Sequence, residues 1–235
     1  MQRQLDRKRF VQLVHTEQIV QDHTVIIGKC AVRFAAVETK KLSESGIDAI
    51  HFDVMDGIFV NNISFGLPIL SSIRKNTDLP IDVHLMIHQP NKFIERFAEA
   101  GANMISFHVE SDSDTQKTIQ LIHSFGIPAG VAISPDTPIE NIFSFLPCLS
   151  AEDFILIMTV YPGLGGQTFM NEMLLKIERL QRYKSQNDFS FHIEVDGGIN
   201  ENTAKLCREK GVDYLVAGSY ITGAADPEQA IKMLK

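Results

Sequence analysis

The stretch "HFDVMDG" at residues 51–57 places a histidine and two carboxylates in an otherwise apolar segment. His51 and Asp53 are two residues apart, so both side chains share one face if the segment is a strand. His84 in "DVHLM" and Asp196 in "EVDGG" also stand near the ends of apolar runs. Burying a charge costs free energy unless the charge is paired or binds a metal. Two histidines and two carboxylates are a suitable ligand set for one divalent metal ion, which could be Zn²⁺, Fe²⁺, Mn²⁺ or Co²⁺.

These residues can meet only if the segments that carry them converge. Eight short apolar runs rich in β-branched residues recur along the chain, at 24–28, 48–55, 80–87, 103–110, 127–134, 153–160, 190–198 and 212–219. They are apolar on both faces, which is typical of strands in a buried parallel sheet. Segments of helical periodicity lie between them, and Gly126 and Gly211 follow two of these as C-cap signals. This order predicts an α/β fold, a single (β/α)₈ TIM barrel, with an open doubly wound sheet as the alternative.

The first residues of the chain fall outside this repeating order. Residues 1–23 are expected to be a short N-terminal extension, and residues 24–235 the barrel domain. Phe10, Leu13 and Val14 could line one side of a short helix that covers the bottom of the barrel. A solvated extension is the alternative interpretation.

Several further residues stand near the predicted strand ends, where barrel enzymes place their catalytic groups. His108 either supports the ligands or is merely solvated, and Asp56 before Gly57 is typical of turn chemistry. Three methionines near the predicted site are either core filler or a soft apolar ring that shields a reacting carbon from water; they are Met55, Met86 and Met158.

Glycines cluster after three consecutive predicted strands, in "YPGLGGQTF" (161–169), "DGG" (196–198) and "AGS" (217–219). Barrel enzymes build phosphate sites from the loops after strands seven and eight and a helix N-terminus. Glycine lets backbone N–H groups approach an anion closely enough to donate hydrogen bonds to it. The clustering predicts a phosphorylated ligand.

Composition limits the classes of function. The chain has 235 residues and a formal net charge of −7, which argues against nucleic acid as a partner. The first ten residues lack the apolar core of a signal peptide, and the run "FILIM" (154–158) is far too short to span a membrane. A cytoplasmic protein without a membrane partner is expected.

Taken together, these motifs resemble the ribulose-phosphate 3-epimerase family. The resemblance extends over roughly residues 46–235 and is carried, in family order, by "HFDVMDGIFVNNISFG" (51–66), "DVHLM" (82–86), "VAISPDTP" (131–138), "LIMTVYPGLGGQTF" (156–169), "EVDGGI" (194–199) and "VAGS" (216–219). The resemblance implies that the fold is a (β/α)₈ barrel. It also implies that the protein is an isomerase of carbohydrate metabolism, which interconverts D-ribulose 5-phosphate and D-xylulose 5-phosphate. It also implies one divalent metal per site and a homo-oligomer.

The resemblance assigns roles residue by residue. His51, Asp53, His84 and Asp196 would be the metal ligands, and Asp53 and Asp196 also the catalytic acid/base pair. The phosphate and the sugar chain would be bound by His84 and the glycine segments, which comprise Gly163, Leu164, Gly165, Gly166, Gly197, Gly198, Gly218 and Ser219. Inverting a carbinol carbon beside a ketone needs a base on one face and an acid on the other, with a cis-enediolate between. A bound metal would stabilise the developing negative charge.

One segment departs from the family pattern. The family's first strand carries a serine that binds substrate, whereas the corresponding "IGKCAVRF" (27–34) lacks it and has Gly28 near its place. Two alternatives to pentulose-phosphate epimerisation therefore stay open. One is 3-epimerisation of a hexulose phosphate such as allulose 6-phosphate, and the other is a weakly active paralogue that binds sugar phosphate.

Overall fold

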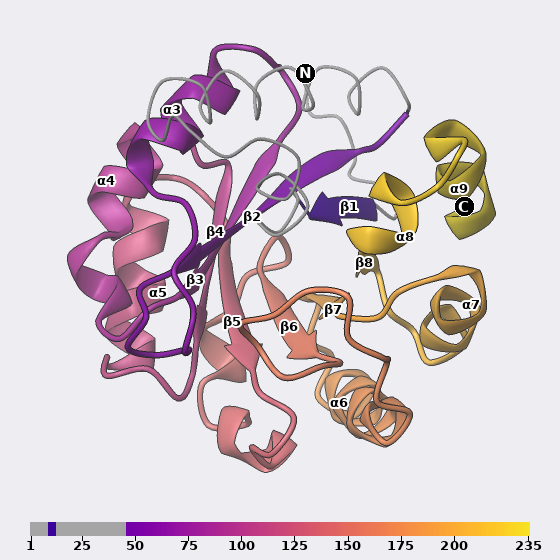
Figure 1. Cartoon of the computed structure of the whole chain (residues 1–235). Coiled ribbons are helices and arrows are strands. Elements are labelled where there is room, and N and C mark those ends of the chain that lie inside the picture. Colours follow the sequence, from indigo (N-terminus) through magenta and orange to yellow (C-terminus); the bar gives the residue numbers. More distant parts are fainter. Residues whose placement is uncertain (1–8, 13–45) are drawn as a thin grey trace.

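The computed structural model describes residues 9–12 and 46–235. Eight parallel strands pair in sequence order and close into a barrel at the centre of the molecule (Figure 1). The strands are β1 Arg9–Gln12, β2 Ala49–Met55, β3 Ile81–Met86, β4 Met104–His108, β5 Ala129–Ile133, β6 Phe154–Met158, β7 His192–Asp196 and β8 Tyr214–Val216. The predicted TIM barrel is confirmed, and the open-sheet alternative is wrong because β1 pairs with both β2 and β8.

Helices surround the barrel (Figure 1). They are α3 Leu67–Arg74, α4 Ile94–Glu99, α5 Thr115–Ser124, α6 Met173–Gln186, α7 Glu201–Glu209, α8 Ser219–Thr222 and α9 Pro227–Leu234, with 3₁₀ turns η1 Pro90–Lys92, η2 Ile139–Ile142 and η3 Leu146–Cys148. Asp114 caps α5 by accepting from the Lys117 N–H, and Asn200 caps α7. Gly126 and Gly211 follow α5 and α7 with positive φ, as predicted for C-cap glycines. Across the described segments, no helix combines the length and apolar character that crossing a bilayer requires.

Alternate strand residues face opposite sides of the barrel wall, because side chains in a strand alternate. Residues such as Ile50, Phe52 and Val54 belong to the large buried cluster that packs between barrel and helices. Ala49, Phe154 and other residues of the opposite register form a second, smaller cluster. Other positions of this inner register carry buried polar residues, which include His51, Asp53, His84 and Glu194.

The N-terminal part differs from the expectation in one respect. Residues Arg9–Gln12 form a strand between β8 and β2, so the predicted helix through Phe10 is wrong at that position. The barrel requires a strand there to close, because β8 and β2 are joined only through β1. Leu13, Val14 and the first predicted strand, 24–28, lie outside the described residues. The boundary between extension and barrel therefore stays a prediction.

Candidate active site and metal centre

Four side chains from three strands converge in the barrel interior. His51 and Asp53 come from β2, His84 from β3 and Asp196 from β7. Each offers one potential ligand atom, and these atoms all lie within 4.8 Å of one another. The structure thus brings together the four residues that the sequence analysis nominated as a metal site, and all four are buried.

Strand register explains how residues so distant in sequence meet. In the pairing of β2 with β3, Asp53 lies opposite His84 and His51 lies opposite Asp82. The Asp53 Oδ1 atom is 3.1 Å from His84 Nδ1 and 3.3 Å from His51 Nε2. Asp196 approaches from the other side of the interior, with Oδ2 4.0 Å from His51 Nε2. Closure of the barrel is what places β7 within reach of β2.

Two further buried acids were missed by the sequence analysis. Asp82 Oδ2 is 2.5 Å from His51 Nδ1, and Glu194 Oε1 is 3.9 Å from the same nitrogen. Both acids stand two residues before a predicted ligand, in "DVH" and "EVD". The two-residue period of a strand puts Asp82 on the face of His84 and Glu194 on the face of Asp196. That spacing was a signal in the sequence that could have identified both residues.

The two histidines respond differently to burial. Burial lowers the pKa of His84 to about 4, although the neighbouring Asp53 acts in the opposite direction. Burial alone would lower the pKa of His51 too, but the charge of Asp82 and the contact with Asp53 raise this pKa well above its usual value.

The acids also differ from one another. Burial raises the pKa of Asp196 to about 7, and the negative charge of Asp53 contributes to this rise. Burial raises the pKa of Glu194 as well, with the charge of Asp82 adding to it. Burial would raise the pKa of Asp53 too, but contacts with His51 and His84 hold it well below its usual value. The site therefore holds more acidic groups than its two histidines can balance, and burial together with their mutual repulsion disfavours the ionised forms of Asp196 and Glu194.

The residues present fit a divalent metal ion. Two imidazole nitrogens and two carboxylates form a donor set that suits several divalent metals. Both carboxylate oxygens of Glu194 and the Oδ1 atom of Asp82 are buried and have no hydrogen-bond partner among the residues that the structure describes. A cation in the cluster would offset the repulsion among these buried acids.

A pocket opens beside the cluster at the mouth of the barrel. Asp53 and Asp196 line it together with the three methionines Met55, Met86 and Met158 and with the predicted glycine segments, which include Gly163, Leu164, Gly165, Gly166, Gly197, Gly198, Gly218 and Ser219. The methionines thus lie at the pocket and are not confined to the core. His84 is fully buried and does not line the pocket, so its side chain faces the cluster instead of the cleft.

Polar side chains hold the glycine segments in place by donating hydrogen bonds to backbone carbonyl groups. The Asn62 amide donates to the Gly163 carbonyl at 2.8 Å, which ties the loop after β2 to the loop after β6. The Thr159 hydroxyl donates to the carbonyls of Asp196 and Gly197 at 2.9 and 2.6 Å. Gly197 and Gly198 both have positive φ, a conformation that L-residues with a side chain rarely adopt. The glycines are therefore required by the shape of these turns.

The structure gives different roles to the two remaining candidates, Asp56 and His108. Asp56 Oδ1 accepts from the N–H groups of Ile58 and Phe59, and its Oδ2 accepts from that of His88, so Asp56 has the predicted role of a turn residue. His108 is completely buried and contacts His84, which excludes the solvated interpretation.

Buried acids and histidines at the strand ends of a closed α/β barrel are characteristic of TIM-barrel enzymes. The model of the ribulose-phosphate 3 epimerase family matches residues 27–222. The chain belongs to the ribulose-phosphate 3-epimerase family, and it is an isomerase of carbohydrate metabolism.

Individual relatives agree with this assignment. The ribulose-phosphate 3-epimerase of Bacillus subtilis is 45% identical over 210 residues, covering 86% of this chain and 93% of the relative. The enzyme named as the cytoplasmic isoform in Oryza sativa is 39% identical, covering 85% and 86% of the two chains. Among solved structures, KGPDC from Streptococcus mutans aligns with a TM-score of 0.69 at 18% identity, over 98% of this chain and 96% of that one. This structural likeness supports the barrel fold.

Proposed function

We propose that this enzyme inverts C3 of D-ribulose 5-phosphate to give D-xylulose 5-phosphate, with Asp53 and Asp196 as the acid/base pair and one divalent metal ion. One observation carries the proposal: Asp53 and Asp196 are the two acidic residues among the described side chains that line the pocket. They enter from β2 and β7, strands on different sides of the barrel mouth. Two carboxylates placed in this way can serve opposite faces of one carbon.

The proposed reaction is two proton transfers at one carbon. One carboxylate takes the proton from C3, and the electron pair of the broken C–H bond enters the bond to C2 of the cis-enediolate. The other carboxylate then returns a proton to the opposite face of C3, which inverts the centre. A divalent metal ion held by His51, Asp53, His84 and Asp196 would supply electrostatic stabilisation for negative charge on the substrate oxygens. Met55, Met86 and Met158 would exclude water from the reacting carbon.

The phosphate is proposed to bind to the backbone of the glycine segments. No lysine or arginine belongs to the described residues that line the pocket. Backbone N–H groups of Gly197, Gly198, Gly218 and Ser219 are then the available donors, and glycine permits the close approach that they need. We place the enzyme in the cytoplasm, as the name of the Oryza sativa relative states for that protein.

The decisive test is exchange of the C3 proton with solvent. Wild-type enzyme, its metal content measured, is incubated with D-ribulose 5-phosphate in deuterated water, and deuterium at C3 is followed by NMR. Asp53→Asn and Asp196→Asn are each expected to lower kcat by a factor of about 10² to 10⁴, the usual contribution of a general acid or base. Asp78→Asn makes the same chemical change at an exposed position and is expected to leave kcat unchanged.

Two results would contradict the proposal. Full activity in Asp53→Asn or Asp196→Asn would remove the acid/base pair. A kcat/KM for allulose 6-phosphate above that for ribulose 5-phosphate would assign the enzyme to a hexulose phosphate.

A further inference from the structure

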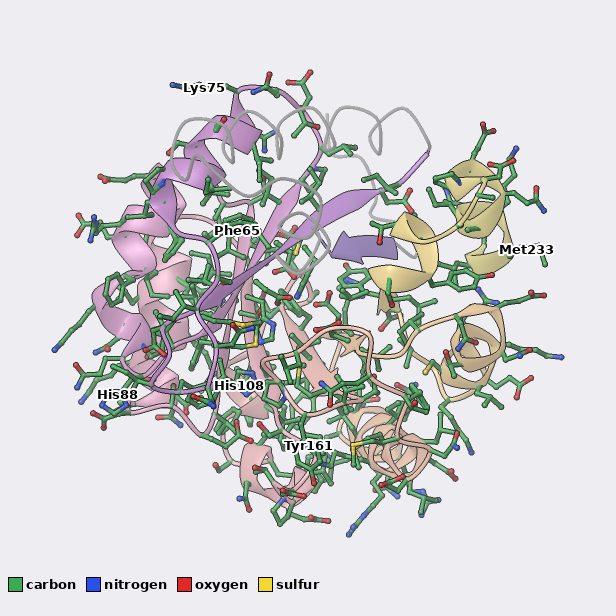
Figure 2. The ribbon with its side chains drawn as sticks, viewed as in Figure 1. Phe65, Lys75, His88, His108, Tyr161 and Met233 are labelled. Atoms are coloured by element: carbon green, nitrogen blue, oxygen red, sulfur yellow. The ribbon has the colours of Figure 1, made fainter. Side chains whose placement is uncertain are left out.

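A third histidine stands directly behind the cluster. His108, the last residue of β4, is completely buried, and its Nε2 atom lies 3.0 Å from His84 Nε2. Its other ring nitrogen, Nδ1, lies 3.0 Å from Glu110 Oε2. Figure 2 shows His108 inside the ring of helices, whereas His88 lies at the outside of the molecule. A continuous line of polar contacts therefore runs from the cluster through His84 and His108 to Glu110.

If His84 binds a metal ion through Nδ1, the protons along this line can be placed in one way. His84 Nδ1 faces the cluster, 3.1 Å from Asp53 Oδ1 and 3.4 Å from His51 Nε2. A neutral imidazole that offers the lone pair of Nδ1 carries its proton on Nε2. His84 Nε2–H then donates to His108 Nε2, which leaves the proton of His108 on Nδ1. That proton is donated to the carboxylate of Glu110.

Glu110 is itself held in place. Its Oε1 atom accepts from the Ser134 backbone N–H at 2.8 Å, while its Oε2 atom faces His108. The Lys176 ammonium of α6 donates to the carbonyls of Ser134 and Pro135 at 2.9 and 2.7 Å, which anchors the loop after β5. The Ser134 hydroxyl is a second, longer partner of His108 Nδ1 at 3.3 Å. Both oxygens of Glu110 thus have donors, and the acid has a defined position.

His51, the other histidine of the cluster, also contacts a carboxylate through its second ring nitrogen. His51 presents Nε2 to the cluster, and its Nδ1 atom is 2.5 Å from Asp82 Oδ2. Each histidine is therefore linked to a carboxylate through the nitrogen that faces away from the cluster. For His51 the link is direct, and for His84 it passes through His108.

We propose that His108 and Glu110 are positioning residues that fix the tautomer and ring orientation of His84, so that Nδ1 is presented to the metal. The inference rests on the proposed function, in which His84 is a metal ligand. Supporting carboxylates of this kind typically contribute a factor of about 10 to 100 in metal affinity. Neither residue touches the pocket, so the effect is on metal binding and not on contact with substrate.

The test measures the dissociation constant of Co²⁺ by competition with a chromophoric chelator at fixed pH. His108→Leu removes the acceptor of His84 Nε2–H and is expected to raise the dissociation constant about 10- to 100-fold. His108→Gln is expected to recover most of the loss, because its amide can accept from His84 and donate to Glu110. Glu110→Gln is expected to have an intermediate effect, because His108 and Ser134 donate to different oxygens of Glu110 and glutamine replaces one of these oxygens with an NH₂ donor.

The control is His88→Leu, the same substitution at an exposed histidine, which is expected to leave the dissociation constant unchanged. Thermal unfolding of the metal-free proteins is measured in parallel to detect loss of folding. Unchanged Co²⁺ affinity in folded His108→Leu and Glu110→Gln would overturn the inference. Equal losses in His108→Leu and His108→Gln would overturn it too. A wild-type enzyme that binds no Co²⁺ would refute the ligand assignment itself and hence the proposed function.

Discussion

Two glycines of the proposed phosphate-binding segments form a matched pair for a test of loop packing. Gly198 and Gly166 both have left-handed backbones, with φ of +65° and +69°. A Cβ atom on Gly198 would lie 2.4 Å from the backbone nitrogen of Phe169, whereas a Cβ atom on Gly166 would meet nothing within 4 Å. Backbone atoms cannot rotate away as a side chain can. Gly198→Ala must therefore force apart the turn after β7 and the loop after β6.

The expected loss of stability is the sum of a backbone term and a packing term. The left-handed conformation costs an alanine about 1–2 kcal/mol, and this term is common to both variants. Insertion of a methyl group into a packed site adds about 1–3 kcal/mol, and this term applies to Gly198→Ala alone. In a domain of this size each kcal/mol lowers Tm by about 2–4 °C, so we expect a fall of about 4 °C for Gly166→Ala and about 10 °C for Gly198→Ala.

Scanning calorimetry at matched metal content measures both values. The KM for the sugar phosphate, from the epimerase assay, is expected to rise more for Gly198→Ala than for Gly166→Ala, because the displaced turn carries proposed phosphate donors. Equal Tm values for the two variants would show that the turn after β7 is not packed against Phe169 as described. The reasoning would then fail, whatever the effect on KM.

Three other predictions concern residues away from the cluster. Asp153 is fully buried and accepts from the N–H groups of Ala129 and Ser150, so Asp153→Ala is expected to cost about 3 kcal/mol in urea unfolding, and a loss below 1 kcal/mol would contradict this role. Lys176→Met removes a charged donor to three loop carbonyls and is expected to cost about 2 kcal/mol by the same assay; an unchanged urea midpoint would refute this. Burial would raise the pKa of Asp213, but the His192 side chain and the Ile193 N–H hold that pKa below its usual value. The ionised Asp213 therefore contributes stability above pH about 4, and this contribution is lost as the pH falls through the folded-state pKa. Asp213→Asn is expected to lower the free energy of unfolding at pH 7, and the difference from wild type should shrink in acid. A difference that stays constant with pH would refute this.

Much of the fold was predictable because its signals are local. Short β-branched runs predicted β2 to β8 to within a few residues, and the glycines after α5 and α7 marked where those helices end. The strand at Arg9–Gln12 was missed, because its four residues do not alternate in polarity and are too few to identify a strand. Its role becomes visible only when β8 and β2 need a neighbour.

The site was predictable in part. The period of two within a strand associated His51 with Asp53, and the same rule would have found Asp82 and Glu194. Glu110 stands two residues after His108, so the same spacing would have associated these two residues as well. Its contact with His108 depends on the course of the loop after β5, where the Ser134 N–H holds it.

The sequence by itself determined which residue types stand at the strand ends and which face of each strand they share, because both follow from the backbone geometry of a few consecutive residues. Only the tertiary structure decided that Asp53 and Asp196, far apart along the chain, line one pocket, and that His84 presents Nδ1 to the cluster and Nε2 to His108. The reason is that barrel closure and strand register set these distances, and both depend on the pairing of all the strands at once.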